Sequence, residues 1–240
     1  MRRFRLILLS VVAATLAACA ELPSPDTSPA TLPPATEFAG IVARLAPVVQ
    51  DTCESTGIAR NCKIRLYVAQ TEEGEVNAFQ SVDGFGRPFV IVTPQLLDAA
   101  QSPDEVALVL AHEAAHHILG HLSRQQEDAV FGATLLGAAA EADGATREQI
   151  REARKIGAFV GARTFSQEYE LEADALGALM VRDAGYDALK GAQFFYRIPD
   201  PGQHALNTHP SNAQRRAVVQ RALRNGQRPA TGLASRDNLG

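Results

Sequence analysis

Apolar residues recur along the chain in runs that predict many helices and a few short strands. Three strands are expected at 63–69, 75–80 and 88–93, with a glycine-rich turn from Asp83 to Pro88 between the last two. Helices are expected at 37–55, 94–100, 103–119, 125–141, 146–162, 167–184, 187–197 and 211–224. The pattern therefore predicts a mainly helical α+β fold with one small sheet.

The helix expected at 103–119 carries the clearest boundary signals. Ser102 suits its N-cap, Pro103 its first position, and Glu105 would complete a capping box. A run of aliphatic residues follows, which predicts that the helix is buried. Gly120 marks its expected end.

The same helix contains the sequence HEAAH, an instance of the HExxH pattern. Residues four apart share one helical face, so His112 and His116 can direct ring nitrogens at a single metal ion. The metal would also satisfy two polar side chains that are costly to bury unpaired. Glu113 lies about 100° round the helix, where it can take a proton from a water molecule that the ion activates.

A catalytic zinc needs a third protein ligand, and the metzincin pattern HExxHxxGxxH does not supply it. Leu119 and Leu122 occupy the positions of its glycine and its last histidine. On a continuous helix His121 would lie about 180° from the first histidine, so it is interpreted as a helix-end residue that faces away from the ion. His117, about 100° from the second histidine, is interpreted as a neighbour of the site or a surface residue.

A better third ligand lies on the helix expected at 167–184. Glu170 and Asp174 are four residues apart and share one face. Glu170 can therefore ligate the metal while Asp174 accepts a hydrogen bond from a zinc histidine, most readily His112.

The other residues of this helix fit the same arrangement. Glu168 and Glu172 fall about 200° away from Glu170, on the opposite side of the helix. Gly177 lies close to the ligand stripe and would let this helix approach the HExxH helix closely. The alternative interpretation is an ordinary acidic helix with a solvated face.

Three motifs in this order carry a family resemblance: HEAAHH, then ELEAD, then Thr208-His209-Pro210 followed by Arg215. Together they resemble the HtpX and CAAX prenyl protease family of zinc metalloproteases, and within it the periplasmic lipoproteins such as LoiP and BepA. The resemblance covers about residues 38–224. It implies a zincin-like domain with a small sheet beside the HExxH helix, one zinc ion per chain, and peptide hydrolysis.

The resemblance also implies roles for residues outside the ligand set. His209 would lie near the active site, where it stabilises the transition state or caps the zinc in a resting form; the alternative is a loop histidine without a role. Arg215 would hold that loop or bind a carboxylate. A sheet edge at Asn77, Ala78 and Phe79 would receive a substrate peptide as an added strand.

The chain departs from the family pattern at one position. Gln167 stands where the family usually has arginine, three residues before the glutamate ligand. Arg163, one helical turn earlier, is the candidate to replace that arginine.

The N-terminal residues predict export. A basic start and an apolar stretch that ends at Ala18 predict a signal peptide over 1–18. The sequence before Cys19 resembles a bacterial lipobox, which implies cleavage there, lipidation of Cys19 and, with alanine next, the outer membrane. Ordinary cleavage after Ala20 is the alternative. The proline-rich residues 19–36 are expected to form a tether.

Cys53 and Cys62 remain once Cys19 is set aside. An even pair of cysteines in an exported protein predicts a disulfide, here between the end of the first helix and the start of the first strand. Two free thiols are the alternative.

The composition of the 240 residues, with net charge −4 and 46% hydrophobic residues, suits one globular domain at 37–226 and a flexible tail at 227–240. The charge does not indicate a nucleic-acid partner. The apolar stretch from Phe131 to Ala140 is too short to span a bilayer and is interpreted as core. The alternatives are that it shields the cleft, contacts a membrane or binds substrate.

These features predict a zinc metalloendopeptidase of the bacterial envelope that cleaves misfolded or mislocalised periplasmic and outer-membrane proteins. Glu113 would act as the general base, and His209 would assist the developing oxyanion. One alternative is an envelope chaperone that works with the outer-membrane assembly machinery and uses the zinc domain mainly for binding. Another is a zinc hydrolase of non-peptide substrates.

Overall fold

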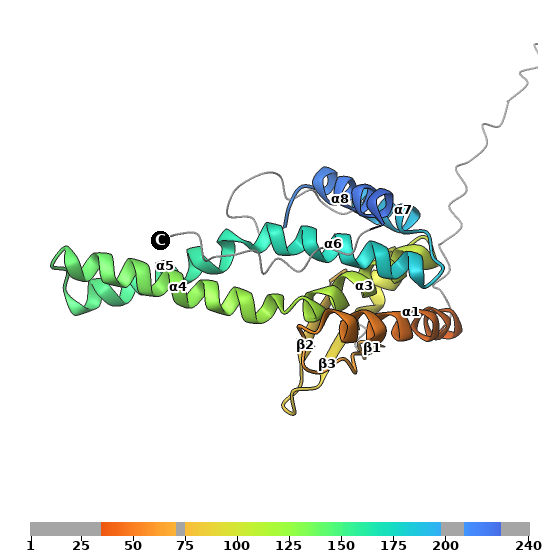
Figure 1. The fold of residues 1–240 in the computed structure, drawn as a ribbon, viewed down its shortest axis with the longest axis horizontal. Helices are drawn as coiled ribbons and strands as arrows, with labels where there is room; N and C mark the ends of the chain where they lie inside the picture. The colour runs from red at the N-terminus through yellow and green to blue at the C-terminus, as the bar shows by residue number, and fades with distance from the viewer. Residues whose placement is uncertain (1–34, 71–74, 198–208, 227–240) are drawn as a thin grey trace, which may run out of the picture.

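The computed structural model describes residues 35–70, 75–197 and 209–226, and these residues form a helical body beside a small sheet (Figure 1). The strands are β1 (Arg65–Val68), β2 (Ala78–Val82) and β3 (Pro88–Val92). The helices are α1 (Ala35–Thr56), α2 (Pro94–Ala99), α3 (Pro103–Ile118), α4 (His121–Ala142), α5 (Arg147–Thr164), α6 (Ser166–Asp183), α7 (Ala188–Gly191), the 3-10 helix η1 (Ala192–Tyr196) and α8 (Asn212–Asn225). The expected mainly helical α+β fold is confirmed.

Several predictions fall outside the described residues. These are the signal peptide, the lipidation site Cys19, the tether up to residue 34, Thr208 of the third motif and the tail at 227–240. In the described part, the helix expected at 187–197 is divided into α7 and η1.

Helix α3 lies at the centre of the body, with α6 on one side and α1 and the sheet on the other (Figure 1). Its aliphatic residues form the core with those of α1, α6 and β3, which include Leu45, Val49, Val90, Val92, Leu108, Leu110, Ile118, Leu176 and Met180. A methyl group at Gly177 of α6 would lie 3.1 Å from the backbone nitrogen of His112. Glycine therefore permits the close approach of α6 to α3 that the sequence predicted.

The predicted start of α3 is only partly right. The Ser102 hydroxyl accepts a hydrogen bond from the Glu105 backbone N–H, as an N-cap does. The Glu105 carboxylate, however, accepts from the Gln101 N–H at 2.7 Å and pairs with Arg197, so the expected capping box is wrong. The buried Glu105 carboxylate therefore connects α3 to Arg197, the residue that follows η1.

The three strands have the order β1-β3-β2, with β3 parallel to β1 and antiparallel to β2. Val90 and Val92 of the central strand β3 are fully buried. Between β2 and β3, the Asp83 carboxylate accepts the backbone N–H groups of Phe85 and Arg87 and fixes the predicted turn. Because β3 is the central strand, β2 is an edge strand of the described sheet. One edge of β2 pairs with β3, and no described strand pairs with its other edge.

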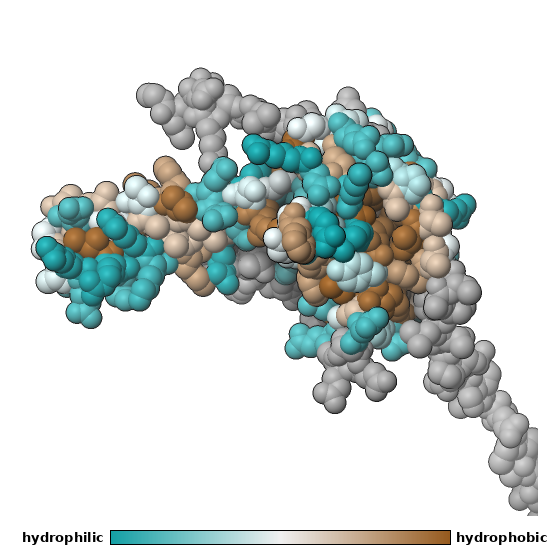
Figure 2. Space-filling view, turned by 90° about the horizontal axis from the view of Figure 1, so that it is seen from below, coloured by the Kyte–Doolittle hydropathy of each residue, from teal (hydrophilic) through white to brown (hydrophobic). Residues whose placement is uncertain are grey.

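Helices α4 and α5 form an arm that extends away from the body (Figure 1). Where they meet, a methyl group at Gly132 would lie 2.1 Å from the carbonyl oxygen of Gly157. Because the two backbones are so close, large side chains point outward, and Phe131 and Leu135 are 69% and 57% exposed. Figure 2 shows apolar residues on the surface of this arm. The interpretation of 131–140 as core is therefore wrong.

No helix in the described ranges combines the length and the apolar character needed to cross a bilayer. This holds for the α4–α5 arm as well as for the body.

Cys53 and Cys62 form the predicted disulfide, with their Cα atoms 5.5 Å apart. Cys53 lies in α1 and is fully buried, whereas Cys62 precedes β1. The bond therefore ties the end of α1 to the chain that enters the sheet.

Reduction of this disulfide is expected to lower the free energy of unfolding by about 2–3 kcal/mol, because the bond restricts the unfolded chain. Urea unfolding of the wild-type protein with and without a reductant measures the difference. The control is a double variant with Cys53→Ala and Cys62→Ala, whose unfolding midpoint should not respond to the reductant. A wild-type midpoint that is unchanged after complete reduction would contradict the expectation.

Candidate metal centre

Three side chains from α3 and α6 converge on one point. The Nε2 atoms of His112 and His116 are 3.1 Å apart, and the Glu170 carboxylate oxygens lie 3.4 Å and 3.3 Å from them respectively. Tetrahedral zinc with bonds of about 2.0–2.2 Å separates its donor atoms by roughly 3.3–3.5 Å. The donor set and its spacing therefore fit a single zinc ion, and within the described residues this is the cluster that could hold a metal.

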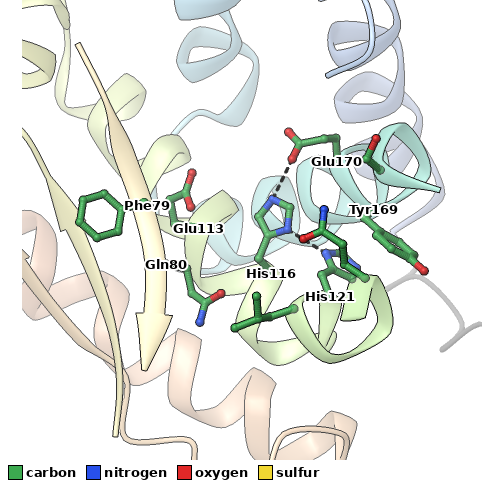
Figure 3. A pocket seen from close by; sticks show the side chains of 10 residues that line it. Phe79, Gln80, Glu113, His116, His121, Tyr169 and Glu170 are labelled. Carbon is green, nitrogen blue, oxygen red and sulfur yellow. Dashed lines mark hydrogen bonds and ion pairs between the residues drawn. The ribbon is translucent and has the colours of Figure 1, made fainter. Parts of the chain in front are cut away.

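Glu113 follows the first histidine of this cluster and lines the cavities on both sides of it. Figure 3 shows its carboxylate between strand β2 and His116. Burial raises the pKa of the Glu113 carboxyl above its usual range. A buried carboxylate of raised pKa beside a metal position is suited to accept a proton from an attacking water molecule.

Asp174 and Arg215 hold the His112 ring on the side of its Nδ1 atom. The Nδ1 atom of His112 lies 2.9 Å from Asp174 Oδ1, so Nε2 is the nitrogen that faces the metal position. Arg215 of α8 donates two hydrogen bonds of 2.7 Å to the same carboxylate, which is completely buried. Burial would raise the pKa of Asp174, but the charge of Arg215 and its hydrogen bonds lower it, so the carboxylate stays ionised.

The electrostatics of His112 follow from this arrangement. Burial would lower the pKa of His112, but the charge of Asp174 and the hydrogen bonds to Asp174 and Glu170 together outweigh it and raise the pKa to about 10. Burial would likewise raise the pKa of Glu170, whereas hydrogen bonds from His112, His116 and His209 lower it. A metal that binds here must displace a proton from His112, because a histidine ligates in its unprotonated form.

His209 contacts the centre, as its motif implied. Its Nδ1 atom lies 2.9 Å from Glu170 Oε2, and its side chain is 55% exposed. Arg215 binds the carboxylate of Asp174, which is one of the two roles that its motif implied.

Comparison with known proteins agrees with this geometry. The sequence model of peptidase family M48 matches residues 43–223, which include every side chain described above. The chain belongs to peptidase family M48. The members of this family are metallopeptidases, and the resemblance inferred from the motifs is confirmed.

Two named relatives are also similar to this chain. A protein of Vibrio cholerae serotype O1, provisionally named a beta-barrel assembly-enhancing protease, is 30% identical over 185 residues, which are 68% of this chain and 37% of the relative. The beta-barrel assembly-enhancing protease of Escherichia coli K12 is 27% identical over 192 residues, 75% of this chain and 38% of that protein. The chain thus spans less than two fifths of the length of these relatives.

In this M48 chain, the predicted substrate edge borders the centre. Phe79 and Gln80 of β2 line one cavity together with Glu113 and His116 (Figure 3). Asn77 and the first residue of β2 line a second cavity of about 340 Å³ on the other side of Glu113. This second cavity has an apolar wall made by Val76, Leu96, Leu108, Val109, Phe194 and Phe195.

His121 and Glu172 lie where sequence reasoning did not expect them. His121 was expected to face away, but its Nδ1 atom lies 2.9 Å from His116 Nδ1 (Figure 3). The position inferred for His121 was wrong because Gly120, with φ of 67°, ends α3 and His121 begins α4 on a new axis. Its interpretation as a helix-end residue outside the ligand set agrees with the structure. Glu172, expected on the far side of α6, lies 3.0 Å from His121 Nε2. Gly120 was the signal in the sequence that α3 ends before His121, so helical periodicity does not predict the direction of His121.

The remaining predicted neighbours point elsewhere. His117 Nε2 lies 2.8 Å from the carbonyl oxygen of Asn61, which agrees with its interpretation as a non-ligand. Arg163, the candidate to replace the arginine missing at Gln167, stacks over the ring of Phe159 in its own helix at 3.9 Å.

Proposed function

We propose that the chain is a zinc-dependent metalloendopeptidase of the bacterial cell envelope. The observation that carries the proposal is the cluster of His112, His116 and Glu170, whose donor atoms are 3.1–3.4 Å apart beside the buried carboxylate of Glu113. The membership of family M48 supports peptide bonds as the target over non-peptide substrates.

Each residue has a role in the proposed reaction. Zinc bound at this centre supplies a Lewis acid that activates water and polarises the scissile carbonyl group. Glu113 takes the proton of the attacking water and delivers it to the leaving amine. Asp174 and Arg215 keep the Nε2 atom of His112 directed at the centre. His209, once it leaves Glu170, donates a hydrogen bond to the developing oxyanion.

The proposed substrate is an unfolded polypeptide segment. An extended peptide can add to the edge of β2, which gives recognition of the main chain with little selectivity for side chains. The apolar cavity beside Glu113 then accepts one large apolar side chain of that peptide. Unfolded or misassembled proteins expose such segments, whereas folded proteins bury them.

The cellular location of the chain is also part of the proposal. Cys19 would carry the lipid that anchors the chain to the outer membrane, facing the periplasm. The names of the two relatives support substrates among outer-membrane β-barrel proteins and contact with the machinery that assembles them. The same names favour the second candidate function, an assembly factor that uses the zinc domain mainly for binding.

Metal analysis and proteolysis of the purified chain test the proposal together. We expect one zinc ion per chain, cleavage of an unfolded protein such as casein, loss of cleavage with a chelator, and recovery when zinc is added back. The absence of bound zinc, or cleavage that survives complete removal of the metal, would refute the proposed enzyme. Zinc binding without any cleavage would favour the binding function.

A further inference from the structure

A chain of polar contacts leads away from the metal centre at His116. It begins at Nδ1 of His116, which lies 2.9 Å from Nδ1 of His121, and continues from His121 Nε2 to Glu172 at 3.0 Å. Arg124 donates to the same Glu172 oxygen at 2.6 Å. The three members beyond His116 come from α4 and α6, so the chain connects the metal centre to the base of the arm.

The protons in this chain can be assigned from what each group is able to do. A carboxylate beside Arg124 accepts hydrogen bonds, so Glu172 receives the Nε2–H of His121. Neutral His121 then has a lone pair at Nδ1 and must accept a hydrogen bond there. The donor that faces it is the Nδ1–H of His116. With its proton at Nδ1, His116 presents the lone pair of Nε2 to the metal position.

The surroundings hold His121 in this role. The residue is 4% exposed, and its ring is stacked on that of Tyr169 with centroids 4.9 Å apart (Figure 3). The guanidinium carbon of Arg124 lies over the same Tyr169 ring, 4.2 Å from its centroid. Burial would raise the pKa of Glu172, but hydrogen bonds from His121 and Arg124 lower it and keep the carboxylate an acceptor.

We propose that His121 is a positioning residue of the metal centre, which holds His116 with its proton on Nδ1 and its Nε2 lone pair toward the metal, and that Glu172 and Arg124 fix His121 in turn. The inference rests on the proposed zinc site. It gives the two histidine ligands separate supports: Asp174 with Arg215 for His112, and His121 with Glu172 and Arg124 for His116.

Zinc affinity, measured by competition with a chromophoric chelator, tests this role without depending on turnover. The change of His121→Leu keeps an apolar side chain but removes the acceptor, and it should weaken zinc binding by about 10–100-fold. His121→Asn offers an amide oxygen near the place of Nδ1 and should bind zinc more tightly than His121→Leu. The matched control is His117→Asn, which removes a neighbouring histidine of α3 that bonds to Asn61, and should leave zinc affinity unchanged.

Nitrogen-15 NMR of the histidine rings provides the second measurement, on the wild-type protein loaded with zinc. We expect His116 protonated at Nδ1 and His121 protonated at Nε2 alone. His121 protonated at Nδ1, or at both nitrogens, would overturn the proposal even where His121→Leu fails to fold. Unchanged zinc affinity in folded His121→Leu, or equal losses in His121→Leu and His121→Asn, would overturn it as well.

The outcomes also separate this inference from the proposed function. If the wild-type chain binds no zinc, the metalloprotease proposal itself fails. If the wild type binds zinc and His121→Leu binds it equally well, only the role of His121 is lost.

Discussion

Replacing Glu113 with glutamine is expected to reduce peptide cleavage by about 10²–10⁴-fold, the usual contribution of a general base or acid. Glutamine keeps the size of the side chain but cannot accept the proton of the attacking water. Zinc content should stay at the wild-type level, because the candidate ligand atoms belong to His112, His116 and Glu170. The rate of cleavage of a quenched fluorescent peptide and the bound zinc are measured on the same sample.

The control for this variant is Glu168→Gln, an identical change at an exposed position of α6. It should leave both cleavage and zinc content unchanged. A folded, zinc-loaded Glu113→Gln protein with wild-type turnover would remove Glu113 from the mechanism.

The same variant distinguishes the two candidate functions in cells. A protease whose role is cleavage should not function with glutamine at position 113. Rescue of a deletion strain by Glu113→Gln would instead indicate that binding, rather than hydrolysis, is the main activity.

The cluster of candidate metal ligands could be predicted from the sequence because its geometry is local. His112 and His116 are one helical turn apart, as are Glu170 and Asp174, so helical periodicity alone brings each pair onto one face. Gly177 then indicated which face of α6 approaches α3, and the structure confirms that approach.

The errors arose where a side chain's neighbours depend on how separate helices are placed. His121 was assigned by continuing the axis of α3 past Gly120, although the chain changes direction there. The stretch 131–140 was assigned to the core because it is apolar, but the glycine contact between α4 and α5 leaves its large side chains outside. Neither outcome follows from periodicity within a single helix.

The prediction for Arg215 was partly successful. Its motif implied a carboxylate partner or a loop contact, but the partner, Asp174, is 41 residues away and on another helix. Only the packing of α8 on α6 brings the two side chains together. The resulting pair is buried, so the loss of either partner is expected to destabilise the fold.

Replacing Arg215 with methionine is therefore expected to lower the free energy of unfolding by about 3–5 kcal/mol, as removal of one partner of a buried ion pair does. Methionine keeps much of the apolar contact with the ring of Phe195, over which the guanidinium lies at 4.1 Å. The loss comes from Asp174, which stays completely buried and keeps His112 as its remaining charged partner. Urea unfolding of the metal-free protein measures the effect separately from zinc binding.

Two further variants show whether the buried charge is the cause. Arg221→Met makes the same change at an exposed position of α8 and should alter stability by no more than about 0.5 kcal/mol. Adding Asp174→Leu to Arg215→Met removes the buried carboxylate that has lost its guanidinium partner and should restore part of the lost stability, although His112 then loses its support. If Arg215→Met unfolds at the same urea concentration as Arg221→Met, the pair does not stabilise the fold. If the double variant is less stable than Arg215→Met, the Asp174 carboxylate still stabilises the fold through His112, and the loss in Arg215→Met does not come from an uncompensated charge.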